Sequence, residues 1–151
     1  MKNFIYAFIM VFLATVFLAM THGPGAEKDT PQSLEGVWEL VNYYTYEANN
    51  VLDSFPNAEG YRQVKIYQDG KVMWSRRVPQ DSTQWYGYGK YMANDTSLTE
   101  TLEYGSASMM RIIDTSRVFS FELQQGKDWF RQISINEDGN RTFSENYIRI
   151  R

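Results

Sequence analysis

The sequence predicts an all-β domain, an eight-stranded up-and-down antiparallel barrel that follows an N-terminal signal segment. Beyond residue 34, short runs of alternating apolar and polar residues are separated by turn signals, a pattern typical of β-strands. No stretch keeps a sustained helical period, and no internal repeat is present. Aromatic residues make up 16% of the chain, with 11 tyrosines and 4 tryptophans, and such residues favour pleated strands.

Residues 1–26 have the pattern of a secretory signal peptide. Lys2 precedes an apolar run over residues 4–20, and small residues follow this run. As a helix, the run would measure about 26 Å, which is short for a membrane span. We therefore expect an exported protein, periplasmic or secreted, with a cleaved signal. The alternative is an uncleaved N-terminal anchor, in which the chain meets the membrane only through residues 4–20.

A polar linker is expected at 27–34, and a barrel domain at 35–151. The first strand, at about 36–46, carries two alternating sets of apolar residues. A long loop over 47–60 follows, and loops of this length are usually functional or mobile. The next two strands, at 61–68 and 71–78, flank Asp69-Gly70 and thus form a predicted hairpin.

The fourth strand, at 84–92, contains Gly87 and Gly89 in the same phase. One face of this strand is therefore bare, which indicates a sharp bend or the close approach of another group. These glycines favour a hollow interior slightly, because they remove side-chain volume from one face. Both faces of 61–68 and of 84–92 carry apolar groups, so the sequence leaves their inward phase open.

Four further strands complete the predicted barrel. A strand at 97–104 precedes a loop at 105–116, for which a short helix and an irregular flap are both considered. The remaining strands are expected at 117–124, 128–136 and 141–150. Eight strands in this order can close on themselves and remove both sheet edges. A barrel of eight strands is just wide enough to be filled by side chains or to hold one small ligand.

Gly36-Val37-Trp38, at the start of the first strand, resembles the Gly-x-Trp signature of lipocalins and their calycin relatives. Further stretches resemble a group of small exported bacterial lipocalin-like proteins of unknown function, over residues 34–151. The resemblance implies that Trp38 closes the barrel floor and that Arg149, with Tyr147 in the same phase, packs across it. The stretches that carry the resemblance are 34–41, 89–91, 98–100, 128–130 and 145–149.

Composition excludes several kinds of chemistry. The chain has no cysteine, so disulfides, thiolate metal sites and cysteine nucleophiles are excluded. The single histidine, His22, lies in the signal segment, so neither a serine–histidine system nor a histidine metal site is expected. We expect no enzyme, no metal and no cofactor. A residual alternative is a hydrolase that uses Glu100 and Glu145 as its acid and base. The formal net charge of −3 argues against nucleic acid as a partner.

The candidate ligand-binding residues combine aromatic walls with charged side chains expected to face inward. Glu100, for example, shares a phase with Leu98, Leu102 and Tyr104. Two interpretations stay open: these charges pair with one another in a filled core, or some remain free to bind a ligand head group. The candidates are Tyr44, Trp74, Arg76, Tyr91, Glu100, Tyr104, Phe121, Arg131 and Glu145.

The leading functional hypothesis is a non-catalytic carrier or sensor for a small amphipathic or aromatic ligand. The ligand would enter the open barrel end beneath 47–60 and 105–116, and its polar group would meet Arg131, Arg76 or Glu100. The alternative is a filled barrel that acts as a structural or interaction module for another envelope protein. The volume of the interior distinguishes the two hypotheses.

Overall fold

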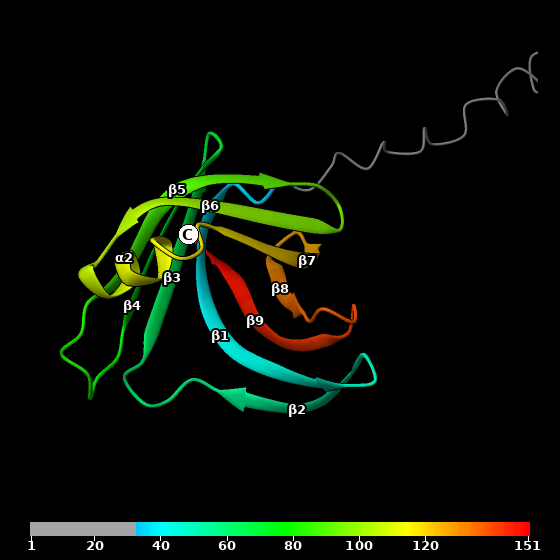
Figure 1. The fold of residues 1–151 in the computed structure, drawn as a ribbon. Helices are drawn as coiled ribbons and strands as arrows, with labels where there is room; N and C mark the ends of the chain where they lie inside the picture. Colours follow the sequence, from blue (N-terminus) through cyan, green and yellow to red (C-terminus); the bar gives the residue numbers. More distant parts are fainter. Residues whose placement is uncertain (1–32) are drawn as a thin grey trace, which may run out of the picture. The chain divides into compact units, whose positions relative to one another are not determined.

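The computed structural model describes residues 33–151, which form one sheet of nine antiparallel strands and a short helix (Figure 1). The elements in chain order are β1 (Gly36–Glu47), β2 (Asn50–Pro56), β3 (Arg62–Gln68), β4 (Lys71–Arg77), β5 (Trp85–Ala93), β6 (Ser97–Gly105), α2 (Ala107–Ile113), β7 (Val118–Gly126), β8 (Trp129–Ile135) and β9 (Arg141–Ile150).

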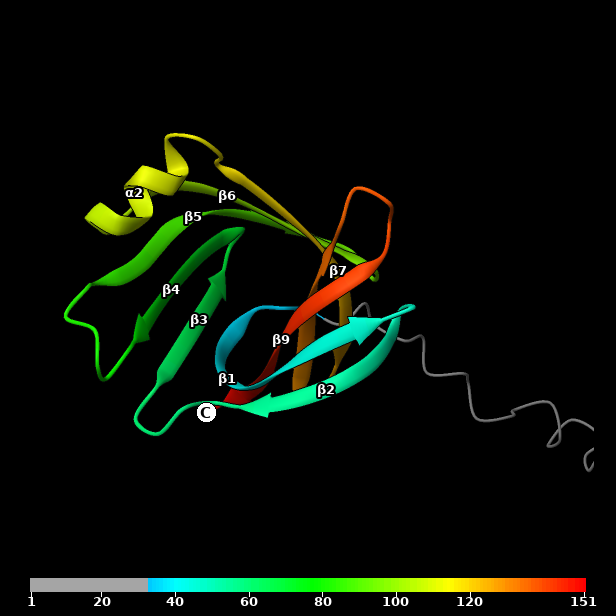
Figure 2. The ribbon, with the colours of Figure 1, turned by 60° about the horizontal axis from the view of Figure 1, so that its bottom comes forward.

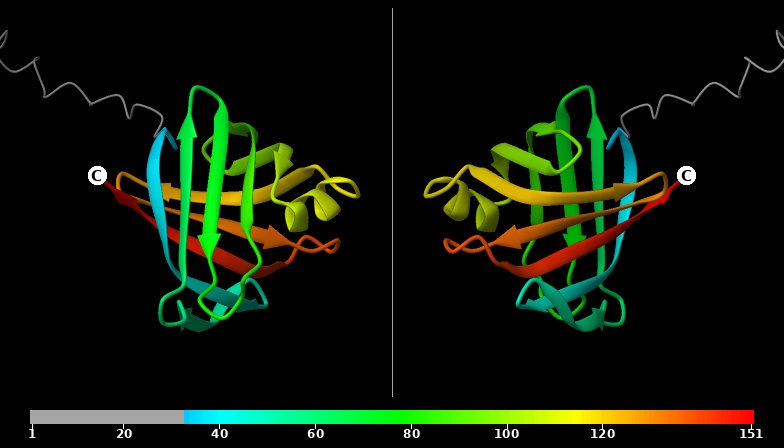
Figure 3. Two further views of the ribbon diagram at one scale, coloured as in Figure 1. Left: turned by 90° about the vertical axis from the view of Figure 1, so that its left-hand side faces the viewer. Right: turned by 90° about the vertical axis from the view of Figure 1, so that its right-hand side faces the viewer.

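Strand β1 joins the two ends of the sheet. The first part of one edge pairs with β3, and the later part of that edge pairs with β2. Its other edge pairs with β9 over most of its length. Strand β1 and the strands from β3 to β9 therefore form a ring of backbone hydrogen bonds, with β2 as an additional strand beside β1 (Figure 2). Strands β3 and β4 run across the direction of β7, β8 and β9 (Figure 3).

The expected long loop over 47–60 is wrong, because half of it is strand β2. Ala48 and Asn49 both adopt positive φ angles, 47° and 63°, and so form a tight hairpin turn between β1 and β2. Every side chain of β2 is exposed, so burial imposes no apolar–polar alternation that the sequence could display. The predicted count of eight strands therefore becomes nine, with eight in the ring.

Of the two interpretations of 105–116, the helix is the correct one. The Ser106 side chain accepts a hydrogen bond from the Met109 amide at 3.2 Å and thereby caps α2. Met109 and Ile113 are buried, so the helix packs its apolar side on β5 and β6. Figure 2 shows α2 beside these two strands.

The core is continuous through the ring, and Trp38 lies at one end of it. Trp38 is 1% exposed, donates its indole proton to the Leu34 carbonyl at 2.7 Å and meets the edge of Phe130 at 4.9 Å between ring centroids. The Arg149 guanidinium lies 4.0 Å from the Trp38 ring centroid. Gly36 has a φ of 131°, and a Cβ there would collide with Arg149. Tyr147 is buried and stacks on Phe130 at 4.6 Å between centroids.

The expected signal segment, residues 1–26, and residues 27–32 of the expected linker lie outside the described residues. Leu34, at the end of that linker, is 3% exposed and belongs to the core. No helix within residues 33–151 has the length and apolar character needed to cross a membrane.

Replacing Trp38 with alanine removes a buried indole, its hydrogen bond and its contact with Arg149. We expect Trp38→Ala to lower the free energy of unfolding by about 3–5 kcal/mol and the melting temperature by roughly 10–20 °C. Thermal denaturation followed by circular dichroism measures this. The control is Met92→Ala at a side chain that is 73% exposed, where the change should stay within about 0.5 kcal/mol. An unchanged melting curve for Trp38→Ala would contradict the assigned role of Trp38.

Candidate functional site

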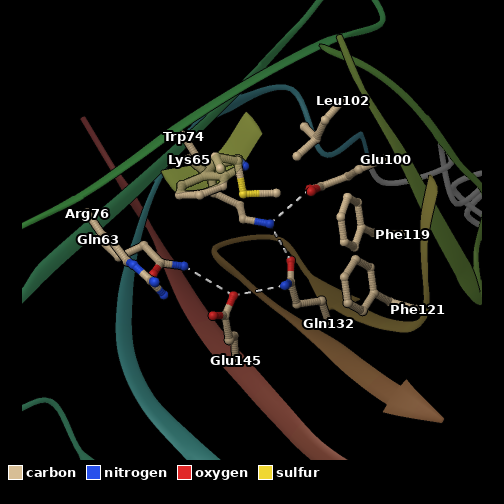
Figure 4. Close-up of a pocket in the computed structure, with 11 residues that line it drawn as sticks. Gln63, Lys65, Trp74, Arg76, Glu100, Leu102, Phe119, Phe121, Gln132 and Glu145 are labelled. Atoms are coloured by element: carbon tan, nitrogen blue, oxygen red, sulfur yellow. Dashed lines mark hydrogen bonds and ion pairs between the residues drawn. The ribbon is translucent and has the colours of Figure 1, made fainter. Parts of the chain in front are cut away.

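The interior of the ring contains a partly open cavity of about 150 Å³ (Figure 4). Its lining comes from β3, β4, β6, α2, β7, β8 and β9, so residues distant in sequence meet there. The lining residues are Gln63, Lys65, Trp74, Arg76, Glu100, Leu102, Met109, Phe119, Phe121, Gln132 and Glu145.

One wall of the cavity is apolar, and the glycines of β5 shape it. Trp74 pairs with Gly87 across the β4–β5 ladder, and a Cβ on Gly87 would lie 2.8 Å from the Trp74 indole nitrogen. A Cβ on Gly89 would collide with the backbone of Thr101. The two glycines thus admit an indole ring and a close strand contact.

A buried ion pair lies on the polar side of the cavity. The Lys65 ammonium lies 2.9 Å from Glu100 Oε1, and both side chains are 4% exposed. Lys65 also donates to Gln132 Oε1 at 2.6 Å, while the Tyr67 hydroxyl donates to the same Glu100 oxygen as Lys65 does. A buried charge is costly unless it is paired and hydrogen-bonded, and both conditions are met here.

The polar network continues from Gln132 to Glu145. Glu145 Oε2 accepts hydrogen bonds from Gln132 at 2.8 Å, from Gln63 at 3.1 Å and from the Tyr147 hydroxyl. Lys65, Gln132 and Glu145 therefore link three strands across the interior, as the dashed lines in Figure 4 show. Each carboxylate of the network therefore accepts at least two hydrogen bonds.

The tyrosines of the network are held in the neutral form. Burial raises the pKa of Tyr67 well above its usual value, and the Glu100 carboxylate raises it further. Burial raises the pKa of Tyr147 in the same way, with a further contribution from Glu145. Both hydroxyls consequently remain hydrogen-bond donors to the carboxylates at any physiological pH.

The Arg76 side chain takes part in no ion pair within residues 33–151. Its guanidinium lies 4.2 Å from the centroid of the Trp85 ring. Its Nε atom is buried and has no hydrogen-bond partner among the described residues. A buried donor in this state costs about 1–3 kcal/mol, which an acceptor from a ligand would relieve.

Five of the nine predicted ligand-binding residues line the cavity: Trp74, Arg76, Glu100, Phe121 and Glu145. Tyr91 does not line it: this residue lines a separate pocket with Leu34 and Asn94, and it packs edge-on against Tyr67, with 4.7 Å between ring centroids. The other three, Tyr44, Tyr104 and Arg131, do not line the cavity either.

Tyr104 faces outward because of a β-bulge in β6. The ladder pairs Tyr88 with Tyr104 but Gly89 with Leu102, so Glu103 has no opposite residue in β5. One extra residue reverses the inward–outward alternation beyond it. Glu100 and Leu102 therefore point inward as expected, whereas Tyr104 is 53% exposed and lies beside Tyr88.

A second bulge explains the position of Tyr44. Leu40 pairs with Tyr147 but Asn42 pairs with Asn146, so Val41 is the extra residue of β1. Beyond the bulge, Tyr44 lies on the outer face, where the Arg131 guanidinium is 5.2 Å from its ring centroid.

The expected inward phase of 128–136 is wrong. Phe130 and Gln132 are buried on the inner face of β8, and Gln132 lines the cavity. Arg131 instead lies on the outer face, 5.0 Å from the Trp129 ring centroid. The sequence-based expectation that Arg131 anchors a ligand in the interior is therefore wrong.

Sequence reasoning missed the polar residues that organise the cavity, above all Lys65, Gln63 and Gln132. Gln63, Lys65 and Tyr67 alternate along β3 and are all buried. The available signal was this alternation, but Val64 and Ile66 supplied an apolar face in the opposite phase. Glu100 and Glu145 are held by Lys65 and Gln132, and no group of acidic residues that could hold a metal ion is present in residues 33–151.

Comparison with known proteins assigns the chain to a family. A model of a domain of unknown function, DUF4488, matches residues 33–151. The chain belongs to the DUF4488 family. A crystal structure of an uncharacterized protein from Bacteroides eggerthii DSM 20697 is similar in fold, with a TM-score of 0.50 and 16% sequence identity over 78% of this chain and 100% of that one. No curated protein matches the chain.

The buried ion pair generates a stability prediction for this DUF4488 domain. Lys65→Met leaves the Glu100 charge buried without its partner, and we expect it to lower the free energy of unfolding by about 3–5 kcal/mol. Adding Glu100→Gln to this variant should recover much of the loss, since the uncompensated charge is then gone. Urea denaturation measures both. The matched surface control is Arg62→Met, whose exposed pair with Glu39 should contribute at most about 1 kcal/mol. Equal effects of Lys65→Met and Arg62→Met would contradict the prediction.

Proposed function

We propose that this protein is a non-catalytic, lipocalin-like barrel that binds a small amphipathic or aromatic molecule inside its ring of strands. The observation that carries this proposal is the partly open cavity of about 150 Å³, which combines an apolar wall with a hydrogen-bonded polar side. Small-molecule sites typically have this composition, with apolar walls and a few convergent polar groups. The closed ring and the contact between Arg149 and Trp38 support the lipocalin-like assignment.

The size of the cavity limits the ligand. A cavity of about this volume accommodates one benzene-sized body, and typical pockets for drug-sized ligands are larger, at about 300–1,000 Å³. The apolar part of the ligand would lie between Trp74, Leu102 and Phe121, all of which line the cavity. Burial of apolar area would supply most of the affinity, at about 25 cal/mol per Å².

The proposal includes export to the periplasm or the cell exterior. It is supported by the signal-like pattern of residues 1–26, in which Lys2 precedes an apolar run. A carrier or sensor in that location would meet small molecules outside the cytoplasm.

A second candidate function is an interaction module for an envelope protein. The observation that favours it is the exposed strand β2, where Val51, Leu52 and Phe55 are 51%, 64% and 45% exposed. Exposed apolar side chains that gather in one place on a protein surface often mark a site of interaction with another protein. This function requires no internal ligand.

The experiment that tests ligand binding adds a neutral aromatic compound, phenol, to the protein recovered after export of the full chain from a bacterial host. We expect the amide NMR signals of the cavity-lining residues to shift on titration. Leu102→Phe, which places a ring in the cavity, should abolish these shifts. The matched control is Met73→Phe, which adds a ring on the outer face of β4 and should leave them unchanged.

Absence of shifts in the unmodified protein would overturn the proposal for small aromatic bodies and favour the interaction module. Shifts that persist in Leu102→Phe would place phenol elsewhere on the protein and overturn the assignment of the cavity as the site.

A further inference from the structure

We infer that the ligand of the interior cavity carries a carboxylate, and that Arg76 is the group that binds it. This inference rests on the proposed function and adds the chemical class of the ligand to it. Three features carry it: the unpartnered guanidinium of Arg76, its fixed position, and the hydrogen bonds that already hold the two carboxylates of the lining.

The hydrogen-bonding state of Arg76 indicates an anion with two acceptor atoms. Arg76 lines the cavity, takes part in no ion pair of residues 33–151, and has a buried Nε atom without a partner there. The guanidinium presents Nε–H and a neighbouring Nη–H side by side, in a fork that matches the two oxygens of a carboxylate. A single hydroxyl or ammonium group cannot satisfy both donors in this way.

The aromatic neighbours of Arg76 hold it in place. Its guanidinium lies 4.2 Å from the Trp85 ring centroid, within the range of a cation–π contact. Trp74, two residues earlier on the same face of β4, also lines the cavity. A fork packed on a ring loses little side-chain freedom when it binds, which favours affinity. The same arrangement places an apolar ring next to the charge.

The two carboxylates of the lining are already held by other side chains of the cavity network. Glu100 is paired with Lys65 at 2.9 Å, and Glu145 Oε2 accepts three hydrogen bonds. Asp81, whose pKa is lowered chiefly by hydrogen bonds from Thr83 and slightly by Arg76, is exposed and accepts from the Thr83 amide at 2.8 Å. A cationic ligand would face the positive charges of Lys65 and Arg76, with Glu100 paired to Lys65 and Glu145 Oε2 already accepting three hydrogen bonds.

The dimensions of the site narrow the class further. The apolar space is close to that of one six-membered ring, and Arg76 lines the same cavity on the side of Gln63, as Figure 4 shows. The expected ligand is therefore a small aromatic or cyclic monocarboxylate, with its ring against Trp74 and Phe121 and its carboxylate at Arg76.

The test compares three compounds with the same ring and different charge: benzoate, benzyl alcohol and benzylamine. Each is titrated at pH 7 into the exported protein, and the Kd is taken from the NMR shifts of the cavity-lining residues. We expect benzoate to bind about tenfold more tightly than benzyl alcohol, because a charge-assisted pair is stronger than a neutral one. Benzylamine should bind most weakly of the three.

Arg76→Gln should remove the preference for benzoate and leave the affinity for benzyl alcohol nearly unchanged. Arg77→Gln is the matched control, since it makes the same change one residue later on the outer face of β4 and should keep the preference. Arg76→Lys retains the positive charge but lacks the two parallel N–H donors, so it should keep only part of the preference for benzoate. The amide spectrum of each variant verifies that the fold is intact.

Each contrary outcome has a distinct meaning. Equal binding of benzyl alcohol and benzoate, or tighter binding of benzylamine, would overturn the carboxylate inference and leave the small-molecule proposal standing. A preference for benzoate that survives Arg76→Gln would overturn the assignment to Arg76. Failure of all three compounds to shift the cavity-lining residues would overturn the proposed function itself.

Discussion

The closure of the sheet through β1 is the constraint on which the rest of the structure depends. One edge of β1 serves two partners in succession, β3 and then β2, while the other edge serves β9. The bulge at Val41 lies between the part of β1 that pairs with β3 and the part that pairs with β2. A bulged strand bends and twists more strongly than a regular one.

The interior of a closed ring must be filled by side chains, and in this protein a polar network fills it together with an apolar core. Trp38, Phe130 and Tyr147 fill one end with stacked and edge-on rings. Next to these rings, Lys65 and Glu100 are buried as a pair in the same network as Gln132 and Glu145. Such groups cannot collapse onto one another as aliphatic side chains do, because their hydrogen bonds require defined separations. A partly open cavity bounded by this network follows naturally.

The site could be predicted from the sequence only in part, and each success and failure has a structural reason. Glu100 and Trp74 were identified because they lie in strands whose alternation is regular up to that point. Tyr104 and Arg131 were misplaced, the first because of a bulge and the second because both faces of β8 carry large apolar groups. Lys65 was overlooked because a lysine in an alternating strand is ordinarily a solvent-facing residue. Its burial depends on Glu100, which is 35 residues away along the chain.

Local sequence features were sufficient to predict the all-β class and the Asp69-Gly70 hairpin, and the resemblance of Gly36-Val37-Trp38 to the lipocalin signature implied the placement of Trp38 against Arg149. These features depend on turn propensity, on the two-residue period and on a short motif, all of which act over a few residues. The ninth strand, the bulges at Val41 and Glu103, and the pairing of the buried charges were decided by the tertiary structure alone. They depend on which strands become neighbours when the ring closes, and a one-residue shift in that pairing reverses which side chains face the interior.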